Sequence, residues 1–527
     1  MVKHEAGVDA TTDSAVDAGE PRTRVTIADG VLEGRVVDGK VRSFLGIPYA
    51  KPPVGALRWK APEKNDTWSA VRDASKFGGR CAQLASSVLQ NAASDDEDCL
   101  YLNVWTPSPA PTSKLPVMIW IHGGGNVNGS ASEPVPFVNS GHFYSGEFLA
   151  QRGVVVVSLN YRLGVLGFFG HQALTKEGSP LGNQGLLDQE LAFEWVKNNV
   201  EKFGGDPANV TIFGESAGSQ DVCLHMASPK SRGLFHRAIS ESGGCTTLNQ
   251  TAPEAQSITE ALAAKVGCTG TDPLACLRGK QVADLLAAVP TDAALGKGFG
   301  PIVDGDFLPE QPRALYDRGD IAKVPYLLGS NSDEGTLFTA GQPLIKDAAD
   351  LSAQLAKTFT PTPAAIEAVY PLGPEVDGGS PYTDVLARAS GDAVLICSTY
   401  DTAVRSANAG LSVYMYNFDI PVDIPGLDLG ATHGSELVYV FGTSPNYTGT
   451  TKMVSDRMQG YWTQFATSGD PNGGGLLAWP KFTEAANVRV NFGLDSTIIK
   501  DFHAKECAFW EKAYDAQFTS IRDAGRD

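Results

Sequence analysis

The stretch Gly214-Glu215-Ser216-Ala217-Gly218 follows the apolar run Val210-Thr211-Ile212-Phe213 and predicts a serine on a sharp turn between a strand and a helix. Such a turn lifts the serine hydroxyl clear of its neighbours only where the residues two before and two after are small, and both are glycine here. A single G-x-S-x-G pattern also arises by chance. The rest of the sequence must therefore supply the other groups that a nucleophilic serine needs.

A nucleophilic serine needs a general base, and with this motif an acid and then a histidine follow the serine along the chain. Only His433 and His503 lie beyond an acid that itself follows Ser216. His433 lies in a turn-like segment just before an apolar run, whereas His503 lies four residues before Cys507, near the end of the chain. We predict that His433 is the base and that His503 is a surface histidine.

Three carboxylates are candidates for the acid. The strand pattern over residues 324–329 runs directly into a segment that contains Asp333 and Glu334, and a carboxylate at the carboxyl end of a parallel strand faces the site. Asp304 is the third candidate, in a segment typical of a turn. Chemistry alone does not separate Asp333 from Glu334.

Backbone N–H groups for an oxyanion hole are predicted in two places. The strand pattern over residues 115–121 ends in His122 and a run of three glycines, which lets the main chain approach a substrate carbonyl closely. We predict that the N–H groups of Gly124, Gly125 and Ala217 bind the oxyanion. His122 is expected to form a hydrogen bond within the loop and not to act as the base.

With these elements in this order, the chain resembles the type-B carboxylesterase/lipase family, which also contains the cholinesterases. The resemblance covers roughly residues 25 to 520. It implies an α/β-hydrolase fold, in which helices flank a large central, mostly parallel sheet and long insertions form a gorge or cap. Further stretches that resemble family signatures are Gly46-Ile47-Pro48-Tyr49-Ala50, Pro52-Pro53-Val54-Gly55, Glu97-Asp98-Cys99-Leu100, Asn160-Tyr161-Arg162-Leu163-Gly164 and Gly182-Asn183-Gln184-Gly185.

The resemblance also implies roles for individual residues. It identifies Glu334 as the acid of a triad with Ser216 and His433, and it places Glu215 and Ser242 around that triad. It further implies two structural ion pairs, Arg58 with Glu97 and Arg162 with Asp188.

Composition is consistent with one large domain. Hydrophobic residues make up 42% of the chain, which is ample for a buried core, and no linker or repeat divides residues 25–527. Residues 154–159 are typical of a central parallel strand, and residues 186–200 have a helical apolar period. Residues 1–24 are predicted to be a disordered leader without the apolar segment of a signal peptide.

Several classes of partner are disfavoured. The net charge of −18 repels nucleic-acid backbones, and the sequence shows no basic stripe with interleaved aromatic residues. No apolar run approaches the roughly 18 residues of a membrane span. The motifs imply no metal and no organic cofactor, and the expected partner is a small-molecule ester. We expect a monomer or a homodimer.

The placement of the eight cysteines favours disulfides. Cys81 and Cys99 flank one loop, and Cys268 and Cys276 flank a shorter one. The resemblance adds a pair between Cys397 and Cys507. Three disulfides are therefore predicted, with Cys223 and Cys245 left free and a fourth bridge between those two as the alternative. Because disulfides persist in oxidising compartments, we expect a secreted or periplasmic protein in its mature form, with the signal peptide absent from this chain.

The predicted function is hydrolysis of carboxylic esters through an acyl-enzyme. The alternatives are a lipase or sterol esterase of the same family and a non-catalytic binding module with the same fold.

Two departures from the family pattern bear on the substrate. The loop between Cys81 and Cys99 has no aromatic residue, whereas cholinesterases place a tryptophan there to bind a quaternary ammonium group. Asn126 follows the glycines where relatives carry an aromatic residue, and it is predicted to line the substrate pocket. A polar or polycarboxylate acyl group would suit it, as in the bacterial fumonisin esterases that the chain also resembles.

Overall fold

The computed structural model describes residues 21–86, 92–134, 141–289, 298–340, 342–373, 380–424, 427–444 and 448–524. Most of the predicted leader, residues 1–20, lies outside this part of the chain. The first strand, β1 (Arg22–Thr26), begins inside the range 1–24 and pairs with the next strand. The predicted end of the leader is therefore a few residues too late.

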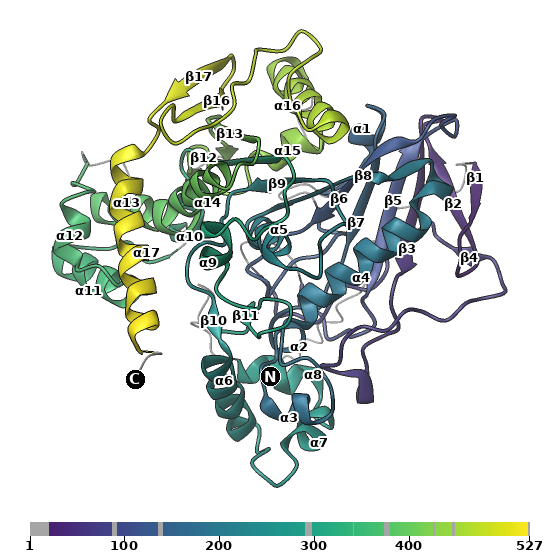
Figure 1. Ribbon diagram of the computed structural model, residues 1–527, viewed down its shortest axis with the longest axis horizontal. Coiled ribbons are helices and arrows are strands. Elements are labelled where there is room, and N and C mark those ends of the chain that lie inside the picture. Colours follow the sequence, from purple (N-terminus) through teal and green to yellow (C-terminus); the bar gives the residue numbers. More distant parts are fainter. Residues whose placement is uncertain are drawn as a thin grey trace, which may run out of the picture.

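One large sheet organises the molecule (Figure 1). It has 13 strands in the order β1-β2-β3-β5-β7-β6-β8-β9-β12-β13-β16-β17, with β4 beside β2. The strands of this sheet are β1 (Arg22–Thr26), β2 (Val31–Val37), β3 (Val41–Pro48), β4 (Arg72–Asp73), β5 (Tyr101–Pro107), β6 (Leu115–Ile121), β7 (Val155–Leu159), β8 (Gly205–Glu215), β9 (Arg237–Glu241), β12 (Tyr326–Asn331), β13 (Val413–Phe418), β16 (Val488–Phe492) and β17 (Ser496–Lys500). Two separate two-stranded sheets are formed by β10 (Gln250–Thr251) with β11 (Ile302–Val303) and by β14 (Asp423–Ile424) with β15 (Leu427–Asp428).

The centre of the sheet is parallel. Strands β7, β6, β8, β9, β12, β13 and β16 pair in parallel, while β1, β2, β3 and β5 on one side and β17 on the other pair antiparallel. Parallel strands need crossover connections, and helices supply them here. The predicted α/β-hydrolase architecture with a large, mostly parallel sheet is thus confirmed. The carboxyl ends of β6, β8 and β12 carry the segments that the sequence analysis singled out.

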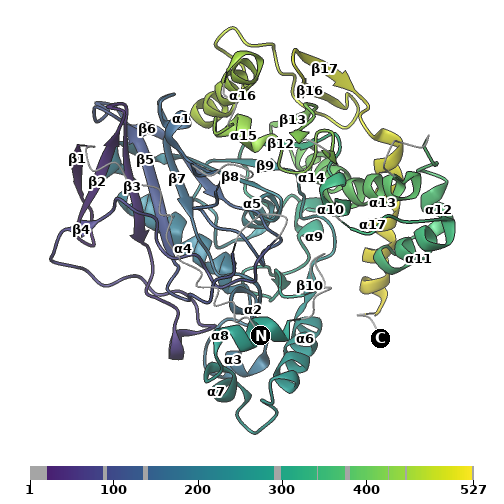
Figure 2. The ribbon, with the colours of Figure 1, turned by 180° about the vertical axis from the view of Figure 1, so that it is seen from behind.

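Helices cover both faces of the sheet, as the opposite views in Figures 1 and 2 show. They are α1 (Glu147–Ala150), α2 (Gly164–Gly167), α3 (Gln172–Lys176), α4 (Gln184–Asn199), α5 (Ala217–Ala227), α6 (Ala252–Lys265), α7 (Pro273–Arg278), α8 (Val282–Ala288), α9 (Pro312–Asp317), α10 (Thr336–Thr339), α11 (Ala348–Thr358), α12 (Pro363–Glu367), α13 (Pro381–Gly391), α14 (Cys397–Asn408), α15 (Leu437–Val440), α16 (Gly449–Ser468) and α17 (Ala504–Ala524). Short 3-10 turns lie at Gly55–Leu57 and Val200–Phe203, and a π-helical turn at Asp392–Ile396 joins α13 to α14.

Successive side chains of a central strand pack in different core clusters, one on each face of the sheet. In β6, Ile119 packs in the core cluster that holds Phe193 of α4, whereas Trp120 packs in the cluster that holds Trp462 of α16. Because successive side chains of a strand point to opposite faces, a strand buried on both faces must be apolar throughout, as the sequence of β6 is.

Two buried ion pairs join segments that lie outside the strands. Arg58 binds both carboxylate oxygens of Glu97, with Nε 2.7 Å from Oε1. Arg162 binds Asp188 in the same bidentate way, with Nε–Oδ2 and Nη2–Oδ1 distances of 2.8 and 2.7 Å. Both pairs that the family resemblance implied are therefore present.

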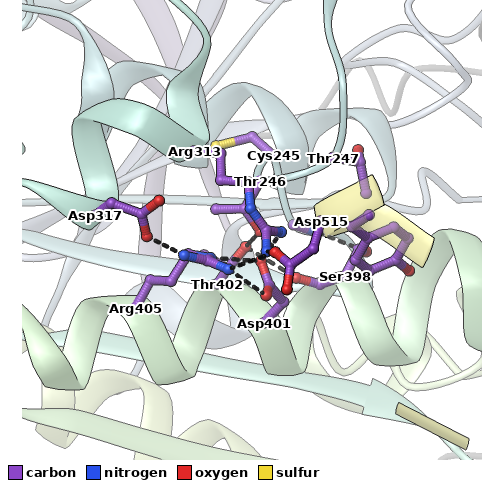
Figure 3. A network of polar contacts seen from close by, with 12 residues as sticks. Cys245, Thr246, Thr247, Arg313, Asp317, Ser398, Asp401, Thr402, Arg405 and Asp515 are labelled. Carbon is purple, nitrogen blue, oxygen red and sulfur yellow. Dashed lines mark hydrogen bonds and ion pairs between the residues drawn. The ribbon is translucent and has the colours of Figure 1, made fainter. Parts of the chain in front are cut away.

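A further cluster of charges fastens the C-terminal helix (Figure 3). Arg313 of α9 binds Asp401 of α14 at 3.2 Å and also binds Asp515 of α17. Arg405 of α14 binds Asp401 at 2.9 Å and pairs with Asp317 of α9. These ion pairs join three helices that are far apart in the sequence.

Eight cysteines form four disulfides. The predicted pairs Cys81–Cys99, Cys268–Cys276 and Cys397–Cys507 are all formed. The prediction that Cys223 and Cys245 are free is wrong, because their Cα atoms lie 5.6 Å apart and their sulfurs are bonded. The physical reason is the packing of α5, which carries Cys223, against the loop that leaves β9.

The fourth disulfide changes the expected thiol count. When the protein is unfolded without a reductant and treated with a maleimide reagent, mass spectrometry should detect no labelled cysteine. After reduction, all eight should be labelled. Labelling of Cys223 and Cys245 before reduction would contradict the fourth disulfide.

Candidate active site

Ser216 lies at the junction of β8 and α5 in a strained backbone conformation. Its φ and ψ are 57° and −123°, in a region that side-chain-bearing residues rarely adopt. The flanking glycines make the turn possible, since a Cβ on Gly218 would lie 2.1 Å from the carbonyl oxygen of Ile121. A Cβ on Gly214 would lie 2.6 Å from the carbonyl of Gly218. The strand-turn-helix predicted from the sequence is therefore present.

The glycine loop lies beside this turn. A Cβ on Gly123 would lie 2.9 Å from the Cβ of Ser216, so the loop passes directly against the serine. Gly124 has φ +107°, where a side chain would meet the carbonyl of Asn128. Gly125 is exposed and Gly124 partly exposed, while Ala217 is the first residue of α5. The three predicted oxyanion donors thus come from two segments that meet at Ser216.

His122 is buried below this loop. Its Nδ1 lies 2.8 Å from the carbonyl oxygen of Gly123, and its ring stacks on Tyr161. Burial lowers the pKa of His122 to about 4, so the ring is neutral at physiological pH. A neutral ring bonded within the loop suits a role in shaping that loop.

Glu334 and His433 are in direct contact. Glu334 lies just after β12, and its Oε2 is 2.6 Å from Nδ1 of His433. The other oxygen, Oε1, accepts hydrogen bonds from the hydroxyl of Ser242 at 2.5 Å and from the backbone N–H of Asn331 at 2.7 Å. The buried carboxylate is thus fixed at both oxygens.

The second nitrogen of the imidazole faces the serine turn. Nε2 of His433 lies 3.1 Å from Oε1 of Glu215, the residue before Ser216. It has no hydrogen-bond partner within the described part of the chain. An imidazole held at Nδ1 by one carboxylate, with Nε2 directed to the serine turn, has the arrangement of a general base, although Glu215 also lies within ion-pair distance of Nε2.

The other sequence candidates lie elsewhere. Asp333 turns away from His433, and its Oδ2 accepts a hydrogen bond from the backbone N–H of Ala431 at 2.8 Å. Asp304 accepts hydrogen bonds from the backbone of its own turn. His503 pairs with Asp392 at 2.7 Å, near the π-helical turn. Its side chain is 28% exposed, so His503 is partly buried beside Asp392 and still reaches the surface.

Comparison with known proteins shows the family of the chain. A model of the carboxylesterase family matches residues 21–510. The chain belongs to the carboxylesterase family. It is also 36% identical over 522 residues to a cholinesterase of Mus musculus, an alignment that covers 90% of this chain and 83% of the relative. The protein is thus a serine carboxylester hydrolase by family.

The site of this carboxylesterase contains buried glutamates that the sequence analysis missed. Burial raises the pKa of Glu241 to about 8, and it also raises the pKa of Glu436 well above its ordinary value. Glu241 accepts a hydrogen bond from the indole N–H of Trp462 at 2.9 Å, and Glu436 accepts one from the side chain of Asn331. Glu436 stands three residues after His433 and Glu241 directly before Ser242, so both flank motif residues in the sequence.

The carboxylates control the charge of the histidine. Burial lowers the pKa of His433, but the negative charges of Glu215 and Glu334 more than offset this effect and raise it to about 9. Burial in turn raises the pKa of Glu215 to about 7, against the opposing effect of His433. A protonated glutamate carries no negative charge. Protonation of the surrounding glutamates therefore lowers the pKa of His433.

Asn126 does not point where the sequence analysis expected. Its side chain is only 2% exposed, and its amide nitrogen donates a hydrogen bond to Oδ1 of Asp221 at 3.0 Å. The predicted pocket-lining donor is thus already used inside this carboxylesterase. The reason is the helix α5, which places a buried carboxylate under the glycine loop.

The described residues hold neither a cluster of metal ligands nor a membrane-spanning helix. Within the residues the structure describes, no three His, Cys, Asp or Glu side chains are grouped so that they could hold a metal ion. In that same part of the chain, the helices are all too short or too polar to cross a membrane.

The charge balance at His433 predicts the pH dependence of this carboxylesterase. A general base must be deprotonated, so kcat/KM should fall as the pH drops through the pKa of His433, which is raised to about 9. Glu215→Gln removes a negative charge that raises this pKa. The acid limb of the kcat/KM profile should then move to lower pH. Glu260→Gln, an exposed change on α6, should leave the limb in place. An unmoved or raised limb in Glu215→Gln would contradict this electrostatic account.

Proposed function

We propose that this protein hydrolyses carboxylic esters with Ser216 as nucleophile, His433 as general base and Glu334 as the acid that orients His433. The observation that carries the proposal is the position of the His433 imidazole between Glu334 and the serine turn. The imidazole is held by Glu334 at 2.6 Å on Nδ1, and its Nε2 is directed to the turn that carries the serine, where it lies 3.1 Å from Oε1 of Glu215. The family supports an ester as the substrate.

In the proposed reaction, the hydroxyl oxygen of Ser216 attacks the ester carbonyl while Nε2 of His433 takes its proton. The carbonyl oxygen becomes an oxyanion, which the N–H groups of Gly124, Gly125 and Ala217 stabilise. When the tetrahedral intermediate collapses, the C–O bond to the alcohol breaks and His433 returns the proton to the leaving oxygen. Water then attacks the acyl-enzyme by the same sequence and releases the acid.

The proposed acid can be tested against its neighbour in the sequence. Glu334→Gln keeps the side-chain shape but removes the charge that stabilises the imidazolium, so kcat should fall by several orders of magnitude, roughly 10⁴-fold. Asp333→Asn should have a much smaller effect, because Asp333 binds the backbone of Ala431. Steady-state turnover of a nitrophenyl ester measures both.

Ser216→Ala completes this test. It removes the nucleophile and leaves the glycines of the turn in place, so activity should drop to the residual roughly 10³-fold over water that binding and the oxyanion hole provide. Circular dichroism should show an unchanged fold. Wild-type-like turnover in Ser216→Ala would exclude the proposed nucleophile, and a larger loss in Asp333→Asn than in Glu334→Gln would exclude the proposed acid. A folded wild-type protein without turnover would favour a non-catalytic binding module.

For the substrate, we propose an ester with a polar or polycarboxylate acyl group, such as the tricarballylate esters of fumonisin. Two features support this narrower proposal. The loop from Cys81 to Cys99 offers no aromatic face for a quaternary ammonium group, although the mouse relative is named a cholinesterase. Asn126 stands where relatives carry an aromatic residue, and it turns inward to Asp221, so position 126 itself presents no aromatic ring to the substrate. A lipase or sterol esterase is the alternative.

A panel of esters separates these substrates. We expect kcat/KM for a tricarballylate or succinate monoester to exceed that for a butyrate ester of the same alcohol by tenfold or more. A choline ester and a long-chain acyl ester should be poorer. Faster turnover of the long-chain ester, with a rise in activity at a lipid interface, would identify a lipase instead.

We also propose that the protein functions outside the reducing cytosol. The four disulfides support this location, because such bonds persist in secreted and periplasmic proteins. Fractionation of the native host is the direct test, and recovery of the active protein from the cytosol alone would overturn the proposal.

A further inference from the structure

A chain of buried hydrogen bonds starts at Asn126, directly after the glycine run. Its amide nitrogen donates to Oδ1 of Asp221 at 3.0 Å, and Oδ2 of Asp221 accepts from Nε2 of Gln189 on α4 at 2.6 Å. The chain continues from Gln189 to Nε2 of His225 at 2.8 Å. Asn126 is 2% exposed, and the side chains of Asp221, Gln189 and His225 are fully buried.

Asp221 is a buried carboxylate whose partners are neutral. Within the described part of the chain no cation pairs with it, and its two oxygens receive only amide donors. Burial raises its pKa to about 7. A buried carboxylate without a cation is costly, and an apolar or hydroxyl side chain could fill the same space. Strongly perturbed carboxylates beside a reactive group are candidates for a functional role.

The position of Asp221 in the fold suggests that role. Asp221 lies on α5, whose first residue, Ala217, is one of the proposed oxyanion donors. Asn126 follows Gly125, another proposed donor. The hydrogen bond between Asn126 and Asp221 therefore links the two segments that must converge on one oxygen atom.

The glycine loop is also held on either side of Asn126. The carbonyl oxygen of Gly124 accepts hydrogen bonds from the N–H groups of Val127 and Asn128, and the side chain of Gln83 bonds both the N–H and the carbonyl oxygen of Gly129. Asn126 has φ 58°, and its carbonyl oxygen accepts a hydrogen bond from the N–H of Gly164 at 2.7 Å. Gly125 itself is exposed. Because three neighbouring glycines give the loop wide conformational freedom, a side-chain anchor directly after them restricts where their N–H groups point.

We propose that Asp221 is a positioning residue for the oxyanion hole: through Asn126 it fixes the glycine loop relative to the helix that follows the nucleophile. It touches neither substrate nor the reacting atoms. This inference rests on the proposed esterase function, and it adds a residue that holds the hole in its active geometry. Gln189 completes the support by occupying the second oxygen of the carboxylate.

Two single variants and their combination test the link. Asn126→Ala and Asp221→Ala should each lower kcat by tenfold to a hundredfold, because displaced donors lose part of the stabilisation that one oxyanion donor provides. KM should change by less than threefold. Since both variants break the same link, the double variant should lose no more than about threefold beyond the more damaging single variant.

A transition-state analogue gives a readout that a general loss of stability would not move. A trifluoromethyl ketone forms a serine adduct that carries the oxyanion, so its affinity should weaken by the same factor as kcat/KM. Ser228→Ala is the matched control. It removes a buried hydroxyl at the far, C-terminal end of the same helix, whose bond is to the carbonyl of Phe307 at 2.7 Å, and it should leave kcat and inhibitor affinity within twofold of wild type.

The outcomes separate this inference from the proposed function. Wild-type kcat in folded Asn126→Ala and Asp221→Ala, or losses that multiply in the double variant, would overturn the role of Asp221 while Ser216→Ala is inactive. If Asp221→Ala does not fold, Asn126→Ala and Asp221→Asn decide the matter by the same measurements. An inactive wild-type protein, or an active Ser216→Ala, would instead overturn the esterase mechanism.

Discussion

The left-handed backbone of Ser216 is the constraint on which the rest of the site depends. A serine with φ 57° is strained, and it persists only where its surroundings allow no alternative. The end of β6 supplies that restriction, because the carbonyl of Ile121 lies where any side chain on Gly218 would be. The same close approach brings the glycine loop, which continues from β6, against the serine. The packing of β6 against the serine turn thus fixes both the position of the nucleophile and that of the proposed oxyanion hole.

Buried negative charge is the second organising feature. Three buried glutamates, at positions 215, 334 and 436, act on one imidazole in a protein of net charge −18, and a fourth, Glu241, interacts with Glu215 and Glu436. Their environments differ. Glu334 is held by Ser242, Asn331 and His433, whereas Glu241 has one indole donor and its pKa is raised to about 8 by burial. Carboxylates in different environments take different protonation states, so a single anion can orient the histidine while its neighbours carry protons.

Local patterns predicted much of the fold. The strand expected over residues 115–121 is β6 (Leu115–Ile121), and the helix expected over 186–200 is α4 (Gln184–Asn199). These predictions succeed because apolar periodicity and the glycines of a sharp turn act within a few residues. The segment with Asp333 and Glu334 was also placed correctly after β12. Residues alone left the choice between them open, since neighbouring side chains leave the chain in different directions and only family resemblance favoured Glu334.

The sequence by itself determined the class of fold, the serine turn and the order of the groups around it, because each depends on a pattern within a short stretch of the chain. Tertiary structure alone decided three points: that Cys223 bonds Cys245, that Asn126 turns inward, and that buried glutamates collect around His433. Each depends on segments that meet only after folding. Asn126 and Asp221 are 95 residues apart, and no local pattern records that the helix after the serine carries its carboxylate beneath the glycine loop.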